Sequence, residues 1–471
     1  MPSENKTPLG LSQWVGRDRP KREDFNDDNL KIDLACRSAL TGLTGHLESE
    51  GHTTAPMRRK WDEASAHTGE GIAGEQGLHG LRYHQGRLEV NVGGIWQLCA
   101  AGEQTGPAYK VYGVCVDTLN TDPEASVTYT DDAVGMTPCG PEWEDTFFAR
   151  LRPCLLKNGK VSRYLNRESY LLDADGGSAD ILTGDEGDVM VEIPKLAYAI
   201  YTEGSRIYVK VTDHPDATAL DSRFCYNAHT RAIQGDRQSL YVGAYLGSAL
   251  GGRLRSLSEK QVEVYRTILD FRKLARANGD GYDLLGYYPY LLLQCLVLIR
   301  CKSRNTQQAM GRGYTYELDA KLATGGTDTK GMFFGEDTGL LQMKAFGLED
   351  LWGNSYYFLD GVRSDAGGFL WTATQSFDSD DCWTNTGQGG GELARGYIGE
   401  VFGNNELGFL MKAGGGGAAA RWCDYGFRRL GCVAFGGGEH YSRLQTGMFL
   451  TFISYETIDY NAVQGARLMY L

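Results

Sequence analysis

Glycine is the residue type that most restricts the fold of this chain. The sequence has 63 glycines among 471 residues, roughly twice the usual share, and only 12 prolines. Glycine weakens the interiors of helices and strands and favours turns with a positive φ. Because the glycines follow no three-residue period, a collagen helix is excluded. The composition therefore predicts many tight turns and long loops shaped by their backbone.

The net charge and the length of the apolar runs each exclude one broad class of function. Lysine and arginine number 47 against 60 acidic residues, a net charge of −13, so there is no basic excess to neutralise the phosphates of a nucleic acid. No apolar run reaches 18 residues, and the longest, 291–299, predicts a buried helix rather than a membrane span. The first six residues lack the apolar segment of a signal peptide, so we expect synthesis in the cytoplasm.

The metal-ligating residue types do not form a recognisable site. The 11 cysteines include no CxxC pair and no Cys/His block at zinc spacing, which predicts reduced, mostly buried thiols. Residues 173–180 contain three aspartates among glycines, but they miss the calcium-loop spacing and its final glutamate, and an Asp/Gly turn is the better interpretation. We expect neither a metal nor a cofactor.

Hydrophobic periodicity predicts an α+β chain in which strands dominate. A hairpin is expected over 81–90, turning at 85–86, and strands are expected at 111–116, 126–129, 189–193 and 207–211. Two helices are expected, one over 258–277 behind a capping box at Ser258 and one over 290–301. The last 170 residues predict loops and short strands. Near the N-terminus, Phe25, Ile32, Ala35 and Ala39 form a thin apolar stripe that suits a helix bundling with copies of itself.

No catalytic motif is present in the sequence. There is no G-x-S-x-G, no P-loop and no GxGxxG. Carboxylates such as Asp378, Asp380 and Asp381 could pair as in a glycosidase, but nothing in their spacing selects a pair. The loops 423–429 and 439–446 instead mix aromatic, cationic and hydrogen-bonding side chains, which is typical of recognition surfaces. The alternative, that these are ordinary surface loops, is equally compatible with composition.

Two segments of the C-terminal half resemble a known fold. Residues 347–354, GLEDLWGN, followed by 356–361, YYFLDG, resemble the G-x-x-D-x-W-G-N signature of the C-type-lectin-like fold. That fold is shared by formylglycine-generating enzymes and by the variable proteins of diversity-generating retroelements. The end of the chain, from Gly437-Gly438 through 465–471, resembles the variable region of the latter, in which side chains of the ligand face vary on a constant backbone. An enzyme of the formylglycine-generating type is disfavoured, because Cys423 and Cys432 lie nine residues apart within the variable stretch.

The N-terminal part resembles phage tail fibres. Residues 14–26 look like a tail attachment segment, and 52–61, HTTAPMRRKW, look like a short repeat of fibre shafts. The combined resemblance implies a multi-domain α+β protein with an N-terminal helical and β fibre-like stalk. Its parts are an attachment segment (1–45), a trimeric stalk (46–105), a β-rich connecting domain (106–188) and a C-type-lectin-like, formylglycine-generating-enzyme-like domain (189–471) with a variable region at about 423–464.

The resemblance implies a phage or prophage tail-fibre receptor-binding protein that is not an enzyme. It would be a homotrimer in the virion, joined to tail or baseplate proteins through its N-terminus and recognising a protein or glycan on the host-cell surface. The alternative function is a tailspike-like enzyme that degrades a host surface glycan, although a long repetitive β-helix is missing from the sequence.

The ligand-binding residues implied by this resemblance should be exposed and should converge on one face. They are Tyr425, Phe427, Arg428, Arg429, Glu439, His440, Tyr441, Ser442, Leu444, Gln445, Phe452, Ser454, Tyr455 and Glu456. Three further residues should be structural: Trp352 as a buried side chain, and Asn354 and Asp360 as hydrogen-bond partners of loop backbone that has no strand partner.

Overall fold

The computed structural model describes residues 81–84, 87–92, 95–98, 109–231, 235–316 and 320–471. The chain forms two compact units, 1–108 and 109–471. The described part of the first unit is an antiparallel sheet of three strands, β1 (Leu81–His84), β2 (Arg87–Val92) and β3 (Ile95–Leu98). It confirms the predicted hairpin. The expected attachment segment, the apolar stripe at 25–39 and the fibre-shaft repeat lie outside the described residues.

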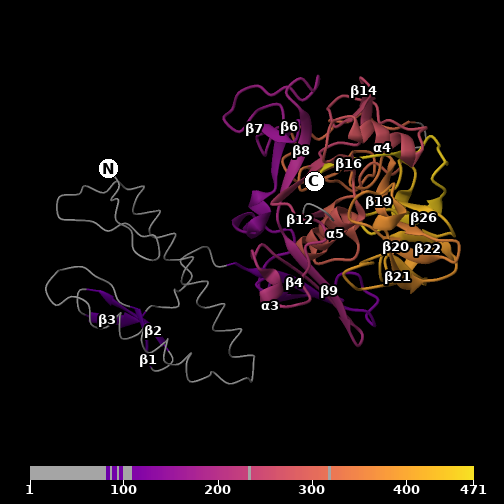
Figure 1. Cartoon of the computed structure of the whole chain (residues 1–471). Coiled ribbons are helices and arrows are strands. Elements are labelled where there is room, and N and C mark those ends of the chain that lie inside the picture. The colour runs from indigo at the N-terminus through magenta and orange to yellow at the C-terminus, as the bar shows by residue number, and fades with distance from the viewer. Residues whose placement is uncertain (1–80, 85–86, 93–94, 99–108, 232–234, 317–319) are drawn as a thin grey trace. The chain divides into compact units, whose positions relative to one another are not determined.

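The second unit is mostly β and contains three larger sheets (Figure 1). The first has the strand order β5-β4-β10-β9, with β4 (Val111–Asp117), β5 (Val127–Asp131), β9 (Ala197–Glu203) and β10 (Arg206–Thr212). The second has the order β16-β28-β13-β8-β6-β7, with β6 (Arg152–Lys157), β7 (Lys160–Tyr164), β8 (Asp188–Pro194), β13 (Ser239–Gly243), β16 (Tyr282–Leu284) and β28 (Leu468–Tyr470). The four strands predicted between 111 and 211 are therefore confirmed.

The third sheet has nine strands and comes entirely from the last 116 residues of the chain. Its order is β21-β20-β19-β25-β26-β24-β22-β23, and β27 pairs with β19. The strands are β19 (Tyr356–Ser364), β20 (Phe369–Thr372), β21 (Thr384–Gly389), β22 (Leu393–Val401), β23 (Met411–Gly414), β24 (Tyr425–Arg428), β25 (Val433–Gly436), β26 (Thr451–Tyr455) and β27 (Gln464–Gly465). Two pairs, β24–β26 and β19–β27, are parallel.

Three two-stranded ribbons and several short helices complete the unit. The ribbons are β11 (Thr230–Arg231) with β12 (Gly235–Asp236), β14 (Ser248–Leu250) with β15 (Arg253–Arg255), and β17 (Lys344–Ala345) with β18 (Leu348–Glu349). The short helices are α3 (Ala217–Leu220), α6 (Thr306–Met310) and the 3-10 turns η1 (Pro141–Asp145), η2 (Phe147–Arg150), η3 (Asp380–Cys382) and η4 (Arg443–Gln445). The sequence did not predict α6, which begins where the Asn305 side chain accepts a hydrogen bond from Gln308 N at 3.1 Å.

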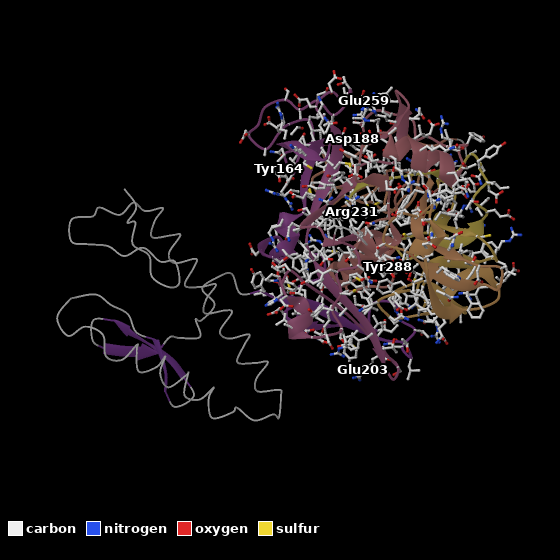
Figure 2. All side chains as sticks on the ribbon, in the orientation of Figure 1. Tyr164, Asp188, Glu203, Arg231, Glu259 and Tyr288 are labelled. Carbon is white, nitrogen blue, oxygen red and sulfur yellow. The ribbon has the colours of Figure 1, made fainter. Side chains whose placement is uncertain are left out.

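Helix α5 (Tyr287–Cys301) lies at the centre of the second unit. All of its residues are buried, as its continuous apolar sequence predicted. It packs against β4 and β10 on one side and β19 on the other, so it joins the four-stranded and nine-stranded sheets (Figure 1). Figure 2 shows side chains filling the space around Tyr288 of this helix. Within the described residues, no helix is long and apolar enough to cross a membrane.

The other predicted helix begins ten residues later than expected. Helix α4 covers Ile268–Arg276, and its cap is Thr267, whose hydroxyl oxygen accepts a hydrogen bond from Asp270 N at 3.1 Å. Ser258, the predicted cap, is buried and its hydroxyl donates to Asp328 Oδ2 at 2.6 Å. The Ser258 hydroxyl is therefore engaged in a tertiary contact, and the capping-box sequence at 258–261 does not start a helix.

The predicted boundary between residues 188 and 189 is wrong. Strand β8 pairs with β6 on one side and with β13 on the other, and β4 pairs with β10. Strands from both sides of the boundary therefore share two sheets, and residues 109–188 belong to the same compact unit as the rest of the chain to Leu471. The predicted boundary at 105/106 lies close to the observed division after Ala108.

Trp352 and Asn354 stabilise the turn that precedes β19, and their predicted structural roles are confirmed. Both are fully buried. Trp352 Nε1 donates to the carbonyl oxygen of Gly311 at 3.1 Å. The Asn354 amide exchanges two hydrogen bonds with the backbone of Leu322, accepting at 3.0 Å and donating at 3.1 Å.

The hydrogen-bond partner predicted for Asp360, loop backbone, is wrong. Asp360 lies within β19, and its carboxylate accepts from Arg272 Nε at 2.6 Å and from Arg272 Nη2 at 2.7 Å. Both side chains are buried. The Arg272 guanidinium, on α4, therefore requires a negative charge beside it, which loop backbone cannot supply. Among the described residues, the only backbone group that donates to the Asp360 carboxylate is the neighbouring Gly361 N, at 3.0 Å.

Replacing Trp352 tests the importance of this core. We expect Trp352→Ala to lower the free energy of unfolding by about 3–5 kcal/mol, because it removes a large buried side chain and leaves a cavity. Denaturant unfolding measures the change. The control Tyr460→Ala, at a residue 63% exposed, should stay within about 0.5 kcal/mol of the wild type. A wild-type unfolding midpoint for Trp352→Ala would contradict the assignment.

Candidate functional site

Four adjacent strands of the nine-stranded sheet gather aromatic side chains on one side. Phe427 of β24 pairs with Phe452 of β26, and Phe452 pairs with Phe435 of β25. On the next strand, Tyr397 of β22 pairs with Tyr425 of β24. Paired residues of neighbouring strands share a face. Together with Tyr356, at the start of the neighbouring strand β19, these strands form the aromatic face, which consists of Tyr356, Tyr397, Tyr425, Phe427, Phe435, Phe452 and Tyr455.

The rings of the aromatic face contact one another along the sheet. Phe452 is the central ring, with Phe435 at 5.8 Å and Phe427 at 6.1 Å between ring centroids, both edge-to-face. Tyr397 and Tyr425 lie 4.4 Å apart in the same arrangement. Phe435 and Phe452 are buried, whereas Tyr397, Tyr425, Phe427 and Tyr455 are partly exposed. The face therefore has a fixed centre and a rim that solvent and a ligand can reach.

Arg395 of β22 adds a positive charge to the aromatic face. Its guanidinium carbon lies 5.1 Å from the Phe452 ring and 5.7 Å from the Tyr425 ring, within cation–π distance. Arg395 Nη2 donates to Gln445 Oε1 at 3.1 Å. The sequence prediction missed Arg395 and Tyr397 because they precede the segment that resembles a variable region. Their i, i+2 spacing in a strand was the signal that could have placed them on one face.

The loop from 437 to 446 borders the aromatic face. Its course requires glycine at position 437, where φ is 87° and a Cβ atom would lie 2.5 Å from the Tyr357 ring. The Ser442 hydroxyl oxygen accepts from Glu439 N at 3.0 Å and closes the turn. Tyr441 and Leu444 are the exposed apolar side chains of this loop, at 43% and 42%.

Glu439 places a buried carboxyl group beside the aromatic face. Burial raises its pKa to about 7, while a hydrogen bond from Tyr441 and the charges of Arg395 and Lys321 act in the opposite direction. Its Oε2 atom has no hydrogen-bond partner within the described structure. Near neutral pH this group is therefore poised between an acceptor-only carboxylate and a carboxylic acid that can also donate.

The backbone of the loops behind the aromatic face is held by side chains of other elements. The carbonyl oxygen of Met448 accepts from Tyr290 OH at 2.7 Å and from Gln294 Nε2 at 2.9 Å, both on α5. Gln307 Nε2 of α6 donates to the carbonyl oxygen of Arg443 at 2.8 Å. Asp424 Oδ2 accepts from Phe449 N at 2.8 Å. These contacts fix main-chain atoms and involve no side chain of the aromatic face.

The predicted ligand residues converge in part. Tyr425, Phe427, Phe452 and Tyr455 belong to the aromatic face, and Glu439, Tyr441 and Gln445 are linked to it by the interactions with Arg395 and Tyr455. Arg429 and Glu456 are exposed at the ends of β24 and β26, and Leu444 is exposed beside Gln445.

The predicted exposure is wrong for six of the fourteen residues. The buried ones are Arg428, Glu439, His440, Ser442, Phe452 and Ser454. Arg428 pairs in register with the core residue Ile453, and its guanidinium donates to the carbonyl oxygens of Gly390 and Gly391 at 3.2 and 3.3 Å. His440 lies against the backbone of Asn354, with 3.3 Å between Nδ1 and the carbonyl oxygen. Strand alternation and the folding of the 437–446 turn onto the unit account for these differences.

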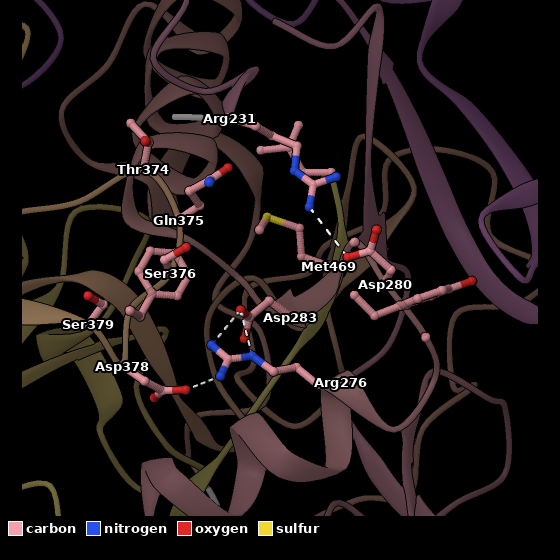
Figure 3. Close-up of a pocket in the computed structure, with 15 residues that line it drawn as sticks. Arg231, Arg276, Asp280, Asp283, Thr374, Gln375, Ser376, Asp378, Ser379 and Met469 are labelled. Carbon is pink, nitrogen blue, oxygen red and sulfur yellow. Dashed lines mark hydrogen bonds and ion pairs between the residues drawn. The ribbon is translucent and has the colours of Figure 1, made fainter. Parts of the chain in front are cut away.

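A separate polar cavity of about 550 Å³ lies between the end of α4, β16 and residues 374–379 (Figure 3). Arg276 occupies its wall between Asp283, at 2.9 Å, and Asp378. Burial and the charge of Asp360 raise the pKa of Asp283 to about 6. The charges in this cavity are largely paired with one another, and it shares no lining residue with the aromatic face. Across the described ranges, no group of three or more His, Cys, Asp or Glu residues could hold a metal ion.

No protein-family model matches this chain, and no curated protein matches it. Of the two sites, the aromatic face combines partly exposed rings, an exposed cation and a buried acid with one unpartnered oxygen, and it is the better candidate for recognition.

Asp424, which lies behind the aromatic face, should make the stability of the protein depend on pH. The residue is buried, and burial raises the pKa of its carboxyl group from 3.8 to about 7, although backbone hydrogen bonds oppose the shift. Between these two values the folded chain binds a proton that the unfolded chain does not, so stability falls as the pH rises through this window. We expect a change from pH 8 to pH 6 to stabilise the protein through this group by about 1.4 kcal/mol.

Asp424→Asn should remove this contribution, because an amide oxygen can still accept from Phe449 N but does not titrate. Thermal unfolding at pH 6 and pH 8 gives the measurement. The exposed control Asp337→Asn should retain the wild-type pH dependence. Equal pH dependence in wild type and Asp424→Asn would show that Asp424 is ionised throughout this range.

Proposed function

We propose that this protein is a receptor-binding tail fibre of a phage or prophage and that the aromatic face binds a ligand on the host-cell surface. The observation that carries the proposal is the layer of aromatic side chains from β22, β24, β25 and β26, whose rim is exposed beside Arg395. The resemblance of residues 347–361 to the C-type-lectin-like signature and of 437–471 to a retroelement-diversified region supports the same function.

The chemistry of the aromatic face suits recognition rather than catalysis. Partly exposed tyrosine and phenylalanine rings provide apolar contact area at a small cost in side-chain entropy. The Arg395 guanidinium supplies several hydrogen-bond donors in a fixed plane, and Glu439 supplies a carboxyl group. A ligand with apolar surface next to hydroxyl or amide groups, such as a glycan or a protein loop, matches this combination.

The backbone anchors support the idea of a variable surface. The side chains of Tyr290, Gln294 and Gln307 hold the loop 443–448 by donating to its main-chain carbonyl oxygens. Side chains at the exposed positions 441 and 444 contribute nothing to those bonds. They can change with little effect on the loop, which is the property that a diversified C-type-lectin-like domain requires.

Removing the charge and the exposed ring of the face tests the proposed function. We expect the double variant Arg395→Ala/Tyr441→Ala to lose at least tenfold in binding of labelled full-length protein to host cells. The melting temperature should change little, because both side chains are exposed. Flow cytometry of cells with bound protein measures the loss.

A matched control is available on another sheet. Arg223 lies over the Tyr201 ring, at 3.7 Å from the centroid, so Arg223→Ala/Tyr201→Ala removes a similar cation–π pair from β9 and its surroundings. This control should bind like the wild type. Equal binding by both double variants would refute the assignment of the aromatic face. Release of reducing sugars from host polysaccharide by the wild type would favour the alternative function, a tailspike-like glycan hydrolase.

The proposed tail fibre is a homotrimer. The apolar stripe Phe25, Ile32, Ala35 and Ala39 is too narrow to bury itself within one chain, and a bundle of three copies would cover it. Light scattering of the full-length protein at micromolar concentration should give three times 51.8 kDa. A single species of 51.8 kDa would rule out this assembly.

A further inference from the structure

Two cysteines from distant parts of the chain lie side by side at the end of the central helix. Cys301 is the last residue of α5, and Cys139 lies in the turn between β5 and η1. Their Sγ atoms are 3.4 Å apart. Cys139 N also donates to the carbonyl oxygen of Arg300 at 2.8 Å, so the backbone of the turn is fastened to the last turn of the helix.

The two thiols differ in their access to solvent. Cys139 is exposed, whereas Cys301 is buried. Both line a cavity of about 270 Å³ whose other walls include Glu124, Ser303 and Gln308. A small reagent can therefore reach Cys139 directly, and Cys301 lies directly behind it.

The local electrostatics favour a thiolate at Cys139. A hydrogen bond with Cys301 and the nearby Arg300 guanidinium lower the pKa of Cys139, although the partial burial of its sulfur atom opposes the shift. Arg300 is itself buried, stacks on Phe333 at 3.9 Å from the ring centroid, and its Nε atom has no hydrogen-bond partner within the described structure. Glu144 Oε1 lies 3.7 Å from Arg300 Nη1, and a negative charge on Cys139 would add a second counter-charge to this buried cation.

We propose that Cys139 and Cys301 form an intramolecular disulfide when the protein meets a small oxidised disulfide such as oxidised glutathione. The Cys139 thiolate attacks one sulfur of glutathione disulfide, and the first glutathione thiolate leaves. Cys301 then loses its proton to solvent, and its sulfur attacks Cys139 Sγ and displaces the second glutathione thiolate. Two protein thiols are oxidised and one glutathione disulfide is reduced to two glutathione thiols.

The geometry requires only a small movement for this step. A disulfide bond is about 2.0 Å long, so the two sulfur atoms must approach by about 1.4 Å. Cys139 lies in an exposed turn, which can move more easily than the buried helix end. The bond would close a loop between residues 162 positions apart and fix the β5–η1 connection to α5.

Peptide mapping tests the proposal on the full-length protein. The protein is equilibrated with excess oxidised glutathione or with dithiothreitol, free thiols are alkylated, and the chain is digested without reduction. We expect a peptide pair linked through Cys139 and Cys301, two hydrogens lighter than the separate peptides, only in the oxidised sample. The melting temperature of the oxidised protein should exceed that of the reduced protein by roughly 5 °C.

Three variants separate the steps. Cys301→Ser should accumulate the mixed disulfide of glutathione on Cys139, whereas Cys139→Ser should leave Cys301 unmodified. Cys382→Ser, which removes a partly exposed cysteine elsewhere, should retain the cross-link. A wild-type protein that stops at the mixed disulfide on Cys139, or that yields no linked peptide in excess oxidised glutathione, would overturn the proposal.

Discussion

One buried guanidinium group connects three parts of the larger unit that lie far apart in the sequence. Arg467 is completely buried just before β28, and its Nη1 donates to the carbonyl oxygens of Gly243 and Ala244 at 2.8 and 3.2 Å. Its Nη2 donates to those of Glu349 and Asp350 at 2.6 and 3.0 Å. A buried charge is stable only when such partners satisfy it. The end of β13, the turn after β18 and the C-terminal strand are therefore fixed relative to one another.

The same principle recurs toward the aromatic face. Buried polar side chains on the helices bond to main-chain atoms or to carboxylates: Tyr290 and Gln294 bond to the Met448 carbonyl, and Arg272 bonds to Asp360 and Asp378. Helix α5 packs against two sheets. The bonds from Tyr290 and Gln294 therefore fix the loop behind the aromatic face relative to the core of the unit. The rim of the aromatic face, which includes Tyr425 and Arg395, takes no part in these hydrogen bonds and is accessible to solvent.

The sequence predicted the elements whose signal is local. Strands at 111–117 and 206–212 and the helix ending at Cys301 follow from apolar periodicity, and the glycine-rich turns follow from composition. The capping box at Ser258 failed because a tertiary hydrogen bond to Asp328 took its side chain, and the boundary at 188/189 failed because strand pairing joins remote segments. At the candidate site, the residue types correctly pointed to the region. Which of the predicted side chains are exposed depends on the pairing register of β24 and β26 and on the turn at 437–446, and no local sequence pattern encodes either.

The anchoring of the 443–448 loop through carbonyl oxygens also affects how the protein can evolve. A mutation replaces a side chain, but it leaves the peptide carbonyl in place, so the bonds from Tyr290, Gln294 and Gln307 survive most codon changes at the exposed positions 443 and 444. Heritable variation is then filtered by what the surface binds and by solubility, and much less by whether the chain folds. A library randomised at exposed positions of this loop would accordingly contain a high proportion of folded members, which makes the unit a natural display scaffold.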